Sequence, residues 1–584
     1  MQNINFLQID ERGRMTHPRR LMSLKNFILG FAAALGLTTA NAAEIPSGPL
    51  TLEQCIQLAL ENNLNLRISN YTPRLSALSL QRVYSGYDPR FTFGTTAGNR
   101  VSKGRQNPLQ FEIPKSETDS FDHNYSLNGI LPTNTRYGIN LRGNESVGLR
   151  DTGPFGSYGS SASIRLTQPL LRDAWSGDSI RMNIKLQKLQ INNSSLTVLL
   201  QIMRTVLSVE EAYYGLIASR ENVKVAEETL ALTEKNFSNQ ERRAEVGTLA
   251  KSQLPQLEAE VLSQQASLLS VRNSYADSIN NLKRLLTDDF AAAQDIDILP
   301  VGELNPVQTV FSRNDSWDKA LNQHPDILQS KIALESADID LKYSKNQLYP
   351  QLDLTAMYAL TGNDNALLSY RHPDGTTGRY PLYESKPRID EKNGGRLVQT
   401  YLKEDGEIYY APAPDARGER LSTPFVGRDA NFSRAFRDIR GMDYPYYSVG
   451  VTLSIPIPNR SARANYKASQ LQNERAVLQH KELEQTILVN IDGLIRDAEY
   501  RFEQITVTRQ ARLSSELALE NDTKRYNEGA IENYQVLQAQ RDLTNRRYAE
   551  INAKVQYLTA LSRLALAEGS TLDNNNINVD FEEE

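Results

Sequence analysis

Histidine, cysteine and acidic side chains are the residues of this 584-residue chain that could support catalysis or metal binding. The five histidines lie far apart in the sequence, at His17, His123, His324, His372 and His480. Zinc ligands recur at short, regular spacings, and these histidines do not. The sequence also has no Gly-rich phosphate loop and no nucleophile elbow. We therefore expect no catalytic residue, no cofactor, no metal and no enzyme activity. The single cysteine, Cys55, is expected to be a small core residue.

Two glycine-bearing turns are the other local feature with a physical role. They are Glu245-Val246-Gly247-Thr248 and Asn527-Glu528-Gly529-Ala530. Each interrupts a long stretch of helix-forming residues. A tight turn between helices needs a residue that tolerates a left-handed backbone, as glycine does. We expect each turn to join two helices.

The helices on either side of these turns are predicted to be very long. Residues 176–246 and 459–528 contain no proline and are rich in helix formers, as is most of 531–568. A helix of about 70 residues is on the order of 100 Å long. No globular core accommodates such a rod, so we expect these helices to pack against equally long neighbours as a coiled coil.

Segments between the helices alternate polar and apolar side chains and are predicted to be strands. They begin at Phe91, Tyr125, Tyr137 and Ser163 in the first half and at Leu352 and Tyr447 in the second. Glycine and tyrosine recur in them. The pattern suits outer-membrane strands, which turn one face to lipid and one to water, although soluble sandwiches alternate too.

The two halves of the chain repeat the same order of elements. Residues 181–190 and 463–472 share Arg, Asn, Lys, Leu and Gln at matching positions, and the same offset places Leu282 on Leu564. Ala59 falls on Ala320 at a second offset. We infer an internal two-fold repeat.

The repeat and its flanking segments predict the domain boundaries. We expect a first repeat at 44–285, a linker at 286–315, a second repeat at 316–568 and an acidic tail at 569–584. Residues 361–445 are rich in Gly, Pro and charge. They are predicted to be an extracellular loop insertion with one short helix at 432–439.

The N-terminus is typical of an exported protein. Lys25 precedes an apolar run, and Ala40-Asn41-Ala42 suits a signal peptidase, which predicts an N-terminal extension and signal peptide over 1–43. The start codon is Met1, Met15 or Met22. No later run of about 18 apolar residues predicts a transmembrane helix. The net charge of −5 gives no basic surplus for nucleic acid.

With these elements in place, the sequence resembles the TolC-type outer membrane efflux protein family over essentially the whole mature chain. The resemblance is carried by Leu52-Glu53-Gln54-Cys55-Ile56, by Leu166-Thr167-Gln168-Pro169-Leu170, by Val536-Leu537-Gln538-Ala539-Gln540, by Tyr557-Leu558-Thr559-Ala560-Leu561 and, most specifically, by Arg525-Tyr526-Asn527-Glu528-Gly529. It implies a mixed α/β membrane protein, a homotrimer in which four strands per chain form a twelve-stranded transmembrane β-barrel. A long periplasmic α-helical coiled-coil barrel continues it. Some strand segments of the first half would then be extended hairpin or loop.

The resemblance also implies function and partners. The protein would export solutes through the outer membrane of a Gram-negative bacterium, as part of a tripartite efflux or type I secretion system. Its partners would be outer membrane lipid, a periplasmic adaptor (membrane fusion protein) and, through it, an inner-membrane pump of RND or ABC type, with no nucleic acid. The sequence leaves the cargo open among drugs, metals and secreted protein.

By the same resemblance, the two turns form a periplasmic tip. The residues expected to dock an adaptor are Val246, Gly247, Thr248, Glu528, Gly529 and Ala530, and those expected at a gate or constriction are Gln253, Tyr526, Gln535 and Gln538. Some family members carry aspartates at this constriction, so these glutamines argue against an acidic, cation-binding gate. We hypothesise a neutral latch in which Gln253 accepts a hydrogen bond from the Tyr526 hydroxyl.

Two alternatives remain open at this point. The helices alone would suit a soluble periplasmic coiled-coil or adaptor protein. The 361–445 insertion would suit an outer-membrane enzyme or adhesin.

Overall fold

The computed structural model describes residues 48–103, 116–150, 153–175, 177–246, 250–379, 398–402, 408–412 and 423–577. Within these ranges the chain forms two compact units. One draws on residues up to Leu78, Lys188–Ser336 and Glu474 onward, and the other comprises Ser79–Gln187 and Ala337–Asn473. Each unit therefore takes residues from both predicted repeats. Among the described residues, no helix has the length and apolar character needed to cross a bilayer.

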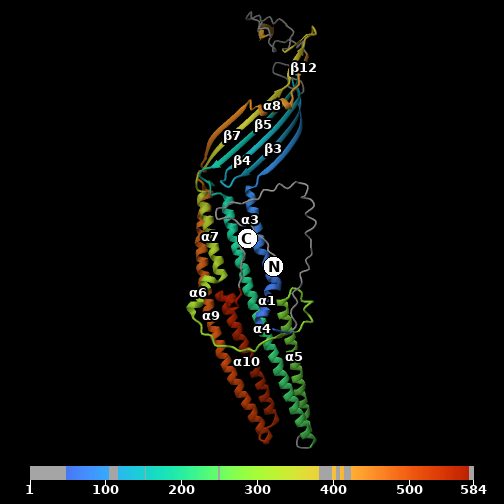
Figure 1. The fold of residues 1–584 in the computed structure, drawn as a ribbon, viewed down its shortest axis with the longest axis vertical. Helices are drawn as coiled ribbons and strands as arrows, with labels where there is room; N and C mark the ends of the chain where they lie inside the picture. Colours follow the sequence, from blue (N-terminus) through green and yellow to red (C-terminus); the bar gives the residue numbers. More distant parts are fainter. Residues whose placement is uncertain are drawn as a thin grey trace. The chain divides into compact units, whose positions relative to one another are not determined.

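Long helices dominate the first unit, as predicted (Figure 1). The longest are α4 (Ser179–Glu245, 67 residues) and α9 (Arg460–Asn527, 68 residues), each followed after a turn by α5 (Leu254–Leu286) or α10 (Asn533–Glu568). The shorter helices are α1 (Leu52–Asn62), α2 (Leu64–Ser69), α3 (Tyr71–Tyr84), α6 (Arg313–Gln323), α7 (Pro325–Asn346) and α11 (Thr571–Asn574). The absence of proline inside α4 and α9 permits their length.

The first helical stretch of each half is broken into separate helices. Asn63 ends α1 with an extended backbone, and its side chain then caps α2 by accepting from the N–H groups of Asn65 and Leu66. The same side chain donates to the Leu285 carbonyl at 3.1 Å, so the break also fixes α1 to the end of α5. In the second half, Pro325 opens α7 directly after His324 ends α6. Proline suits the first position of a helix and not its interior.

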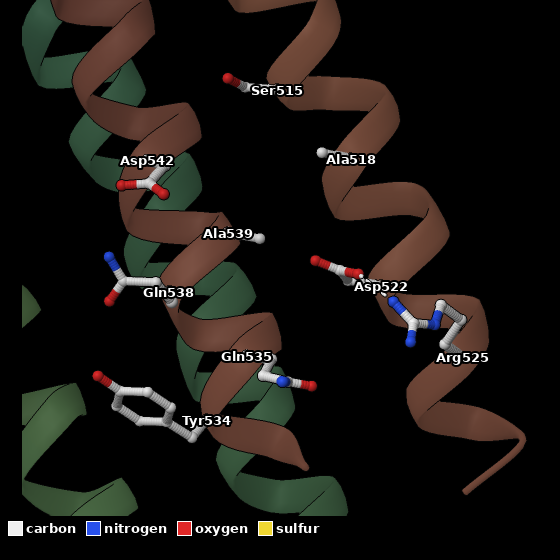
Figure 2. Close-up of a pocket in the computed structure, with 9 residues that line it drawn as sticks. All are labelled: Ser515, Ala518, Asp522, Arg525, Tyr534, Gln535, Gln538, Ala539 and Asp542. Carbon is white, nitrogen blue, oxygen red and sulfur yellow. Dashed lines mark ion pairs between the residues drawn. The ribbon is translucent and has the colours of Figure 1, made fainter. Parts of the chain in front are cut away.

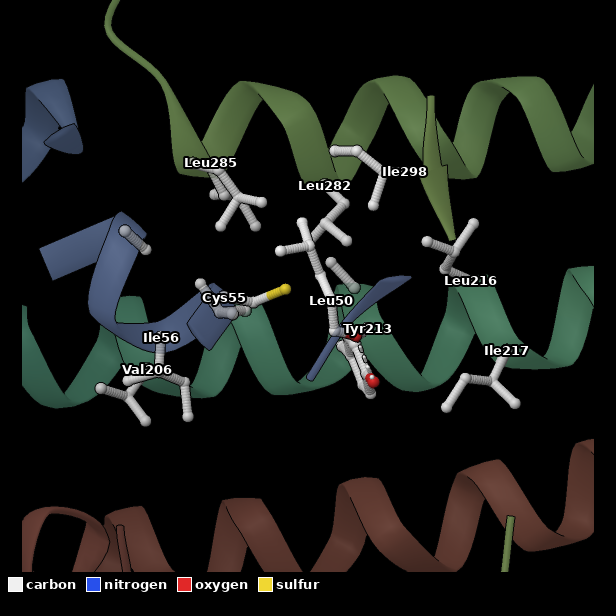
Figure 3. Close-up of a cluster of buried hydrophobic side chains, with 14 of the residues drawn as sticks. Leu50, Cys55, Ile56, Val206, Tyr213, Leu216, Ile217, Leu282, Leu285 and Ile298 are labelled. Atoms are coloured by element: carbon white, nitrogen blue, oxygen red, sulfur yellow. Dashed lines mark hydrogen bonds between the residues drawn. The ribbon is translucent and has the colours of Figure 1, made fainter. Parts of the chain in front are cut away.

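The main hydrophobic core joins α1, α4 and α5 (Figure 3). A short parallel strand pair, β1 (Gly48–Leu50) with β6 (Ile298–Pro300), packs into it, and the Tyr213 hydroxyl lies 3.0 Å from the Leu50 carbonyl. Cys55 has no exposed surface in this cluster, which confirms its prediction as a core residue. The pairing of β1 with β6 was not predicted.

A second core cluster repeats this arrangement with α6, α9 and α10. Ala59 in the first core corresponds to Ala320 in the second, and Leu282 corresponds to Leu564, as their sequence offsets predict. All four are at least 97% buried. The internal repeat is therefore visible in the packing as well as in the order of elements.

The second unit is built on one antiparallel sheet of six strands (Figure 1). The strands are β2 (Arg90–Ser102), β3 (Ser116–Ile130), β4 (Arg136–Arg150), β5 (Gly153–Pro169), β7 (Gln351–Asn365) and β13 (Pro445–Ser454). Their order across the sheet is β13-β7-β5-β4-β3-β2. The sheet has two strands more than the four expected from each chain, and the extended hairpin expected in the first half, formed by β3 and β4, is paired within it. All four first-half segments are paired strands of this sheet.

The segment between β7 and β13 contains more regular structure than the predicted loop with one short helix. Helix α8 (Phe432–Gly441) confirms that prediction. Five short strands accompany it in separate small sheets: β8 (Leu367–Arg371), β9 (Thr377–Gly378), β10 (Val398–Leu402), β11 (Ile408–Pro412) and β12 (Thr423–Arg428). The Asp364 carboxylate at the end of β7 anchors the segment by accepting from Arg428 and Arg434.

Candidate functional site at the helical turns

The turn between α9 and α10 has the geometry expected of its glycine. Gly529 has a left-handed φ of +76°, its N–H donates to the Tyr526 carbonyl at 2.9 Å, and the Ala530 N–H donates to the Arg525 carbonyl at 2.9 Å. This paired arrangement is a Schellman motif, which stops a helix and reverses the chain. Most other residues at this position would be strained by its positive φ.

The predicted docking residues that are described lie on exposed surface. Val246 at the end of α4 is 75% exposed, and Glu528, Gly529 and Ala530 are exposed in the α9–α10 turn. Gly247 and Thr248 lie outside the described residues. An apolar side chain as exposed as Val246 is available to another protein, although single exposed apolar residues are common.

Tyr526 joins the ends of the two long helices. From the last turn of α9, its hydroxyl donates to Gln240 Oε1 at 2.7 Å and accepts from Arg243 Nη1 at 2.6 Å. The Arg243 guanidinium also lies 5.2 Å from the centre of the Tyr526 ring, within cation–π range. Gln240 is 98% buried, so its amide is held in place to receive the hydroxyl. We call Tyr526, Gln240 and Arg243 the tyrosine latch.

The hydrogen-bond partner expected for Tyr526 was the wrong one. In the part of the chain that the structure describes, the hydroxyl bonds Gln240 and Arg243 of α4 and not Gln253. Gln253 instead ends a single 3-10 turn (Lys251–Gln253) before α5 and is exposed there. Sequence reasoning missed Gln240 and Arg243, although the offset that places Leu282 on Leu564 also places Arg243 on Arg525.

Gln535 and Gln538 line a hollow of about 400 Å³ between α9 and α10 (Figure 2). Its other lining residues include Asp522, Arg525, Tyr534 and Asp542. In the view of Figure 2, Gln535 extends toward the side of α9 that carries Asp522 and Arg525.

This hollow is not as neutral as the glutamines alone suggested. Arg525 Nη1 lies 3.6 Å from Asp522 Oδ1, and the charges of the two side chains offset each other. Asp542 adds a second carboxylate. Sequence reasoning missed both aspartates because it considered only the positions matched to the family's gate.

Ion pairs join the helices above the turns. Arg541 of α10 pairs with Glu260 of α5 between the two helical hairpins, and Arg512 of α9 pairs with Glu550 of α10 within the second hairpin. Both carboxylates are more than 90% buried. The hydrogen bond from Arg541 lowers the pKa of Glu260 despite its burial. Burial raises the pKa of Glu550, but hydrogen bonds from Lys554 and Arg512 outweigh it, so the net shift is downward.

The described residues contain no group of three or more His, Cys, Asp or Glu side chains placed to hold a metal ion. The arrangement at the turns can make and break hydrogen bonds between helices and present an exposed surface.

Comparison with known proteins gives one family match and several structural matches. The family model described as outer membrane efflux protein matches residues 140–287 and 421–570, which together make up half of the chain. The probable outer membrane lipoprotein SilC of Salmonella typhimurium is 23% identical over 151 residues, which is 26% of this chain and 32% of that protein. The aligned part therefore spans about a third of that relative's length.

Two solved structures illustrate the fold match. A membrane protein from Pseudomonas aeruginosa is 16% identical with a TM-score of 0.57, covering 89% of this chain and 92% of that one. The Campylobacter jejuni CmeC outer membrane channel is 14% identical with a TM-score of 0.55, covering 91% of this chain and 90% of that one. At these identities, the likeness shows a shared fold.

Proposed function

The chain belongs to the outer membrane efflux protein family, and we propose that three copies of it form the exit duct of a tripartite efflux or type I secretion system. As a member of this family, it is a channel protein of the Gram-negative outer membrane rather than an enzyme. Its fold is the TolC-like outer membrane channel fold, with long helices, strands and two repeats. The two family matches end near residues 287 and 570, which supports our division into repeats at 44–285 and 316–568.

The six-stranded sheet carries the proposal of a shared transmembrane β-barrel. One of its faces bears large exposed apolar side chains, among them Ile139, Ile164 and Tyr358. Its outermost strands, β2 and β13, each have one edge that pairs with no other described strand. A bilayer cannot satisfy the N–H and C=O groups of such edges, so other copies have to close the sheet. Channels of this family form trimers in efflux complexes.

The helices would continue this barrel as a periplasmic tunnel ending at the two turns. A periplasmic adaptor would dock on Val246, Gly247, Thr248, Glu528, Gly529 and Ala530. The exposure of Val246, Glu528, Gly529 and Ala530 supports this assignment. An inner-membrane pump of RND or ABC type would supply the energy through the adaptor. Drugs, metals and secreted protein remain the candidate cargoes.

The tyrosine latch would hold the tunnel tip closed. Its three side chains connect α9 to α4, so separating the two helices breaks two hydrogen bonds and a cation–π contact. Gln253, Gln535 and Gln538 would line the constriction beside it. Adaptor binding to the adjacent turns would favour the separated state, because a ligand shifts a conformational equilibrium toward the state it binds better.

The alternative of a soluble periplasmic coiled-coil or adaptor protein is disfavoured by the same sheet. A soluble protein rarely leaves a contiguous apolar surface of this kind exposed. The alternative of an enzyme or adhesin seated in the 361–445 insertion gains no support from the described part of that segment, where Asp364 is engaged with Arg428 and Arg434.

Fractionation and conductance measurements test the proposed function. We expect the protein in the outer membrane fraction as a trimer that dissociates only on heating, and we expect the purified trimer to conduct ions across planar bilayers. Recovery as a water-soluble single copy without conductance would contradict the proposal.

A further inference from the structure

The first half of the chain contains a strand hairpin that the second half lacks. Strand β2 follows α3 as β7 follows α7, and β5 precedes α4 as β13 precedes α9. Between β2 and β5, however, the chain adds β3 and β4, each 15 residues long. A transmembrane β-strand needs about 9–11 residues, so both are long enough to span a bilayer.

The added hairpin is fully incorporated in the sheet. Strand β3 pairs with β2 from Arg90↔Asn128 to Ser102↔Ser116, and β4 pairs with β5 from Arg136↔Thr167 to Arg150↔Gly153. Neither ladder has a register shift. The β3–β4 hairpin is therefore part of the continuous sheet and not an attachment to its edge.

The turn of this hairpin is short and fixed in place. Asn134, within the 131–135 turn, has a left-handed φ of 60° and is 95% buried. Its side-chain amide donates to the Asp173 carbonyl at 2.7 Å, in the segment that leads into α4. Outer-membrane barrels have short turns on the periplasmic side, which is where this attachment would place the turn.

On β3 and β4, as on the neighbouring strands, one face is apolar and the other is mostly polar. Directly opposite one another across all six strands lie Phe91, Leu127, Ile139, Ile164, Tyr358 and Tyr447. One residue further along, the opposite face carries Thr92, Ser126, Asn140, Ser163, Ala359 and Tyr446. An apolar outer face and a mostly polar inner face are what a strand needs between lipid and a water-filled lumen.

The apolar surface also shifts along the strands from one edge of the sheet to the other. On β13 it runs from Tyr447 to Leu453, toward the end that leads into α9. On β2 the apolar surface starts at Phe91, which lies in the same cross-strand row as Tyr447. From that row it extends to the side opposite to that taken on β13, away from the end of β2 that follows α3. Strands tilted by about 35–45° require such a stagger in a closed barrel. The stagger continues through β3 and β4.

From these observations we infer that each chain contributes six strands, including the β3–β4 hairpin, and that three copies close an eighteen-stranded barrel by pairing β13 of one copy with β2 of the next. The inference rests on the trimer of the proposed function. An even number of strands makes the two outer strands antiparallel to each other, so β13 and β2 of successive copies meet as antiparallel neighbours. Each junction is head to tail, the type of interface that closes a ring.

The extra hairpins widen the barrel. With strands about 4.8 Å apart and tilted by about 40°, eighteen strands form a ring about 36 Å across between backbones, against about 24 Å for twelve. Barrels of about 16–18 strands enclose an aqueous channel. The added hairpin thus gives an exit wide enough for large cargo.

Single cysteines on the hairpin test the inference in native outer membranes. The variants are Tyr125→Cys and Leu141→Cys on the apolar face, and Asn124→Cys and Asn140→Cys on the polar face. Strand β5 supplies the matched control with Ile164→Cys and Ser163→Cys. Cys55 is fully buried and burial raises its pKa to about 12, so it stays unreactive. A charged, membrane-impermeant maleimide is the probe, and only variants that remain heat-dissociable trimers are compared.

We expect the polar-face cysteines of β3, β4 and β5 to react at least about tenfold faster than the apolar-face cysteines, because lipid covers the latter. Alternation on β5 with equal labelling at both faces of β3 and β4 would overturn the inference and leave the proposed function intact. Absence of alternation on β5 as well would overturn the transmembrane barrel itself.

Discussion

Between α3 and α4 the first half of the chain passes through four strands of the sheet, whereas between α7 and α9 the second half contributes only β7 and β13. The second half uses its remaining residues for α8 and the short strands outside the six-stranded order. The helices of the two halves, by contrast, agree closely in length and in buried positions. Val209 of α4 and Ile491 of α9, related by the repeat offset, both have no exposed surface.

The physical reason for this difference is how each element is packed. A long helix that changed length alone would lose its matched neighbour and expose an apolar stripe. A sheet can accept an added hairpin without such a loss, because two strands preserve the antiparallel alternation and satisfy each other's backbone groups. The helical part of the fold is therefore constrained, while the strand part is free to change in steps of two.

The largest expected effect tests the equivalence of the two helical cores. Leu282→Ala and Leu564→Ala should each lower the free energy of unfolding by about 2–5 kcal/mol, because each removes a buried side chain and leaves a cavity. Both side chains are almost fully buried, at 0% and 3% exposure. Denaturant titration of the purified protein measures both losses. A large loss at one site with little loss at the other would break the equivalence.

A slightly smaller effect sharpens the contrast in the strands. Leu141→Arg should destabilise the protein by about 2–4 kcal/mol, because it places a charge on the lipid-facing side of β4. Its neighbour Asn140→Arg serves as the matched control and should change stability little, since Asn140 lies on the polar face. Folding into lipid vesicles under urea titration compares the two. Equal losses would mean that β4 does not face lipid.

Acidification should weaken the ion pairs that join the helices above the turns. The folded-state pKa values of Glu260 and Glu550 are lowered from 4.5, so the unfolded chain takes up protons first. The stabilisation that they give is complete above pH 4.5 and is lost as the pH falls through the lower folded-state values. Unfolding titrations between pH 7 and pH 3 measure this loss. A Glu260→Gln, Glu550→Gln double variant should show a shallower acid dependence than the natural protein.

The smallest expected effect concerns the tyrosine latch. Tyr526→Phe removes two hydrogen bonds worth about 0.5–1.5 kcal/mol each, which would raise the population of open channels by about fivefold to about 150-fold. Tyr534→Phe is the control, because Tyr534 is 58% exposed on the neighbouring helix. Single-channel recording in planar bilayers measures the open fraction. An unchanged open fraction in Tyr526→Phe would remove the latch from the account.

Features set by local sequence were predictable. Freedom from proline predicted α4 and α9, alternation predicted every segment of the six-stranded sheet, and the glycine of the second turn predicted the left-handed residue at Gly529. Alternation gives the two faces of a strand but not its partners. The sequence alone therefore could not decide whether β3 and β4 joined the sheet, and the family resemblance pointed to too few strands.

Features set by contacts between distant residues were missed. Gln240 and Arg243 lie more than 280 residues from Tyr526, and Leu50 and Pro300 meet only when β1 pairs with β6. The break at Asn63 was also missed, because an asparagine ends a helix only where its side chain finds partners such as the Leu285 carbonyl. These are properties of the folded chain rather than of any local pattern.

Electron cryomicroscopy of the protein in lipid nanodiscs is the most direct test of the central claim. Counting strands in a cross-section of the membrane region should give eighteen, with β13 of each copy beside β2 of the next. A twelve-stranded ring, with the β3–β4 hairpin outside it or with only two copies present, would contradict the account.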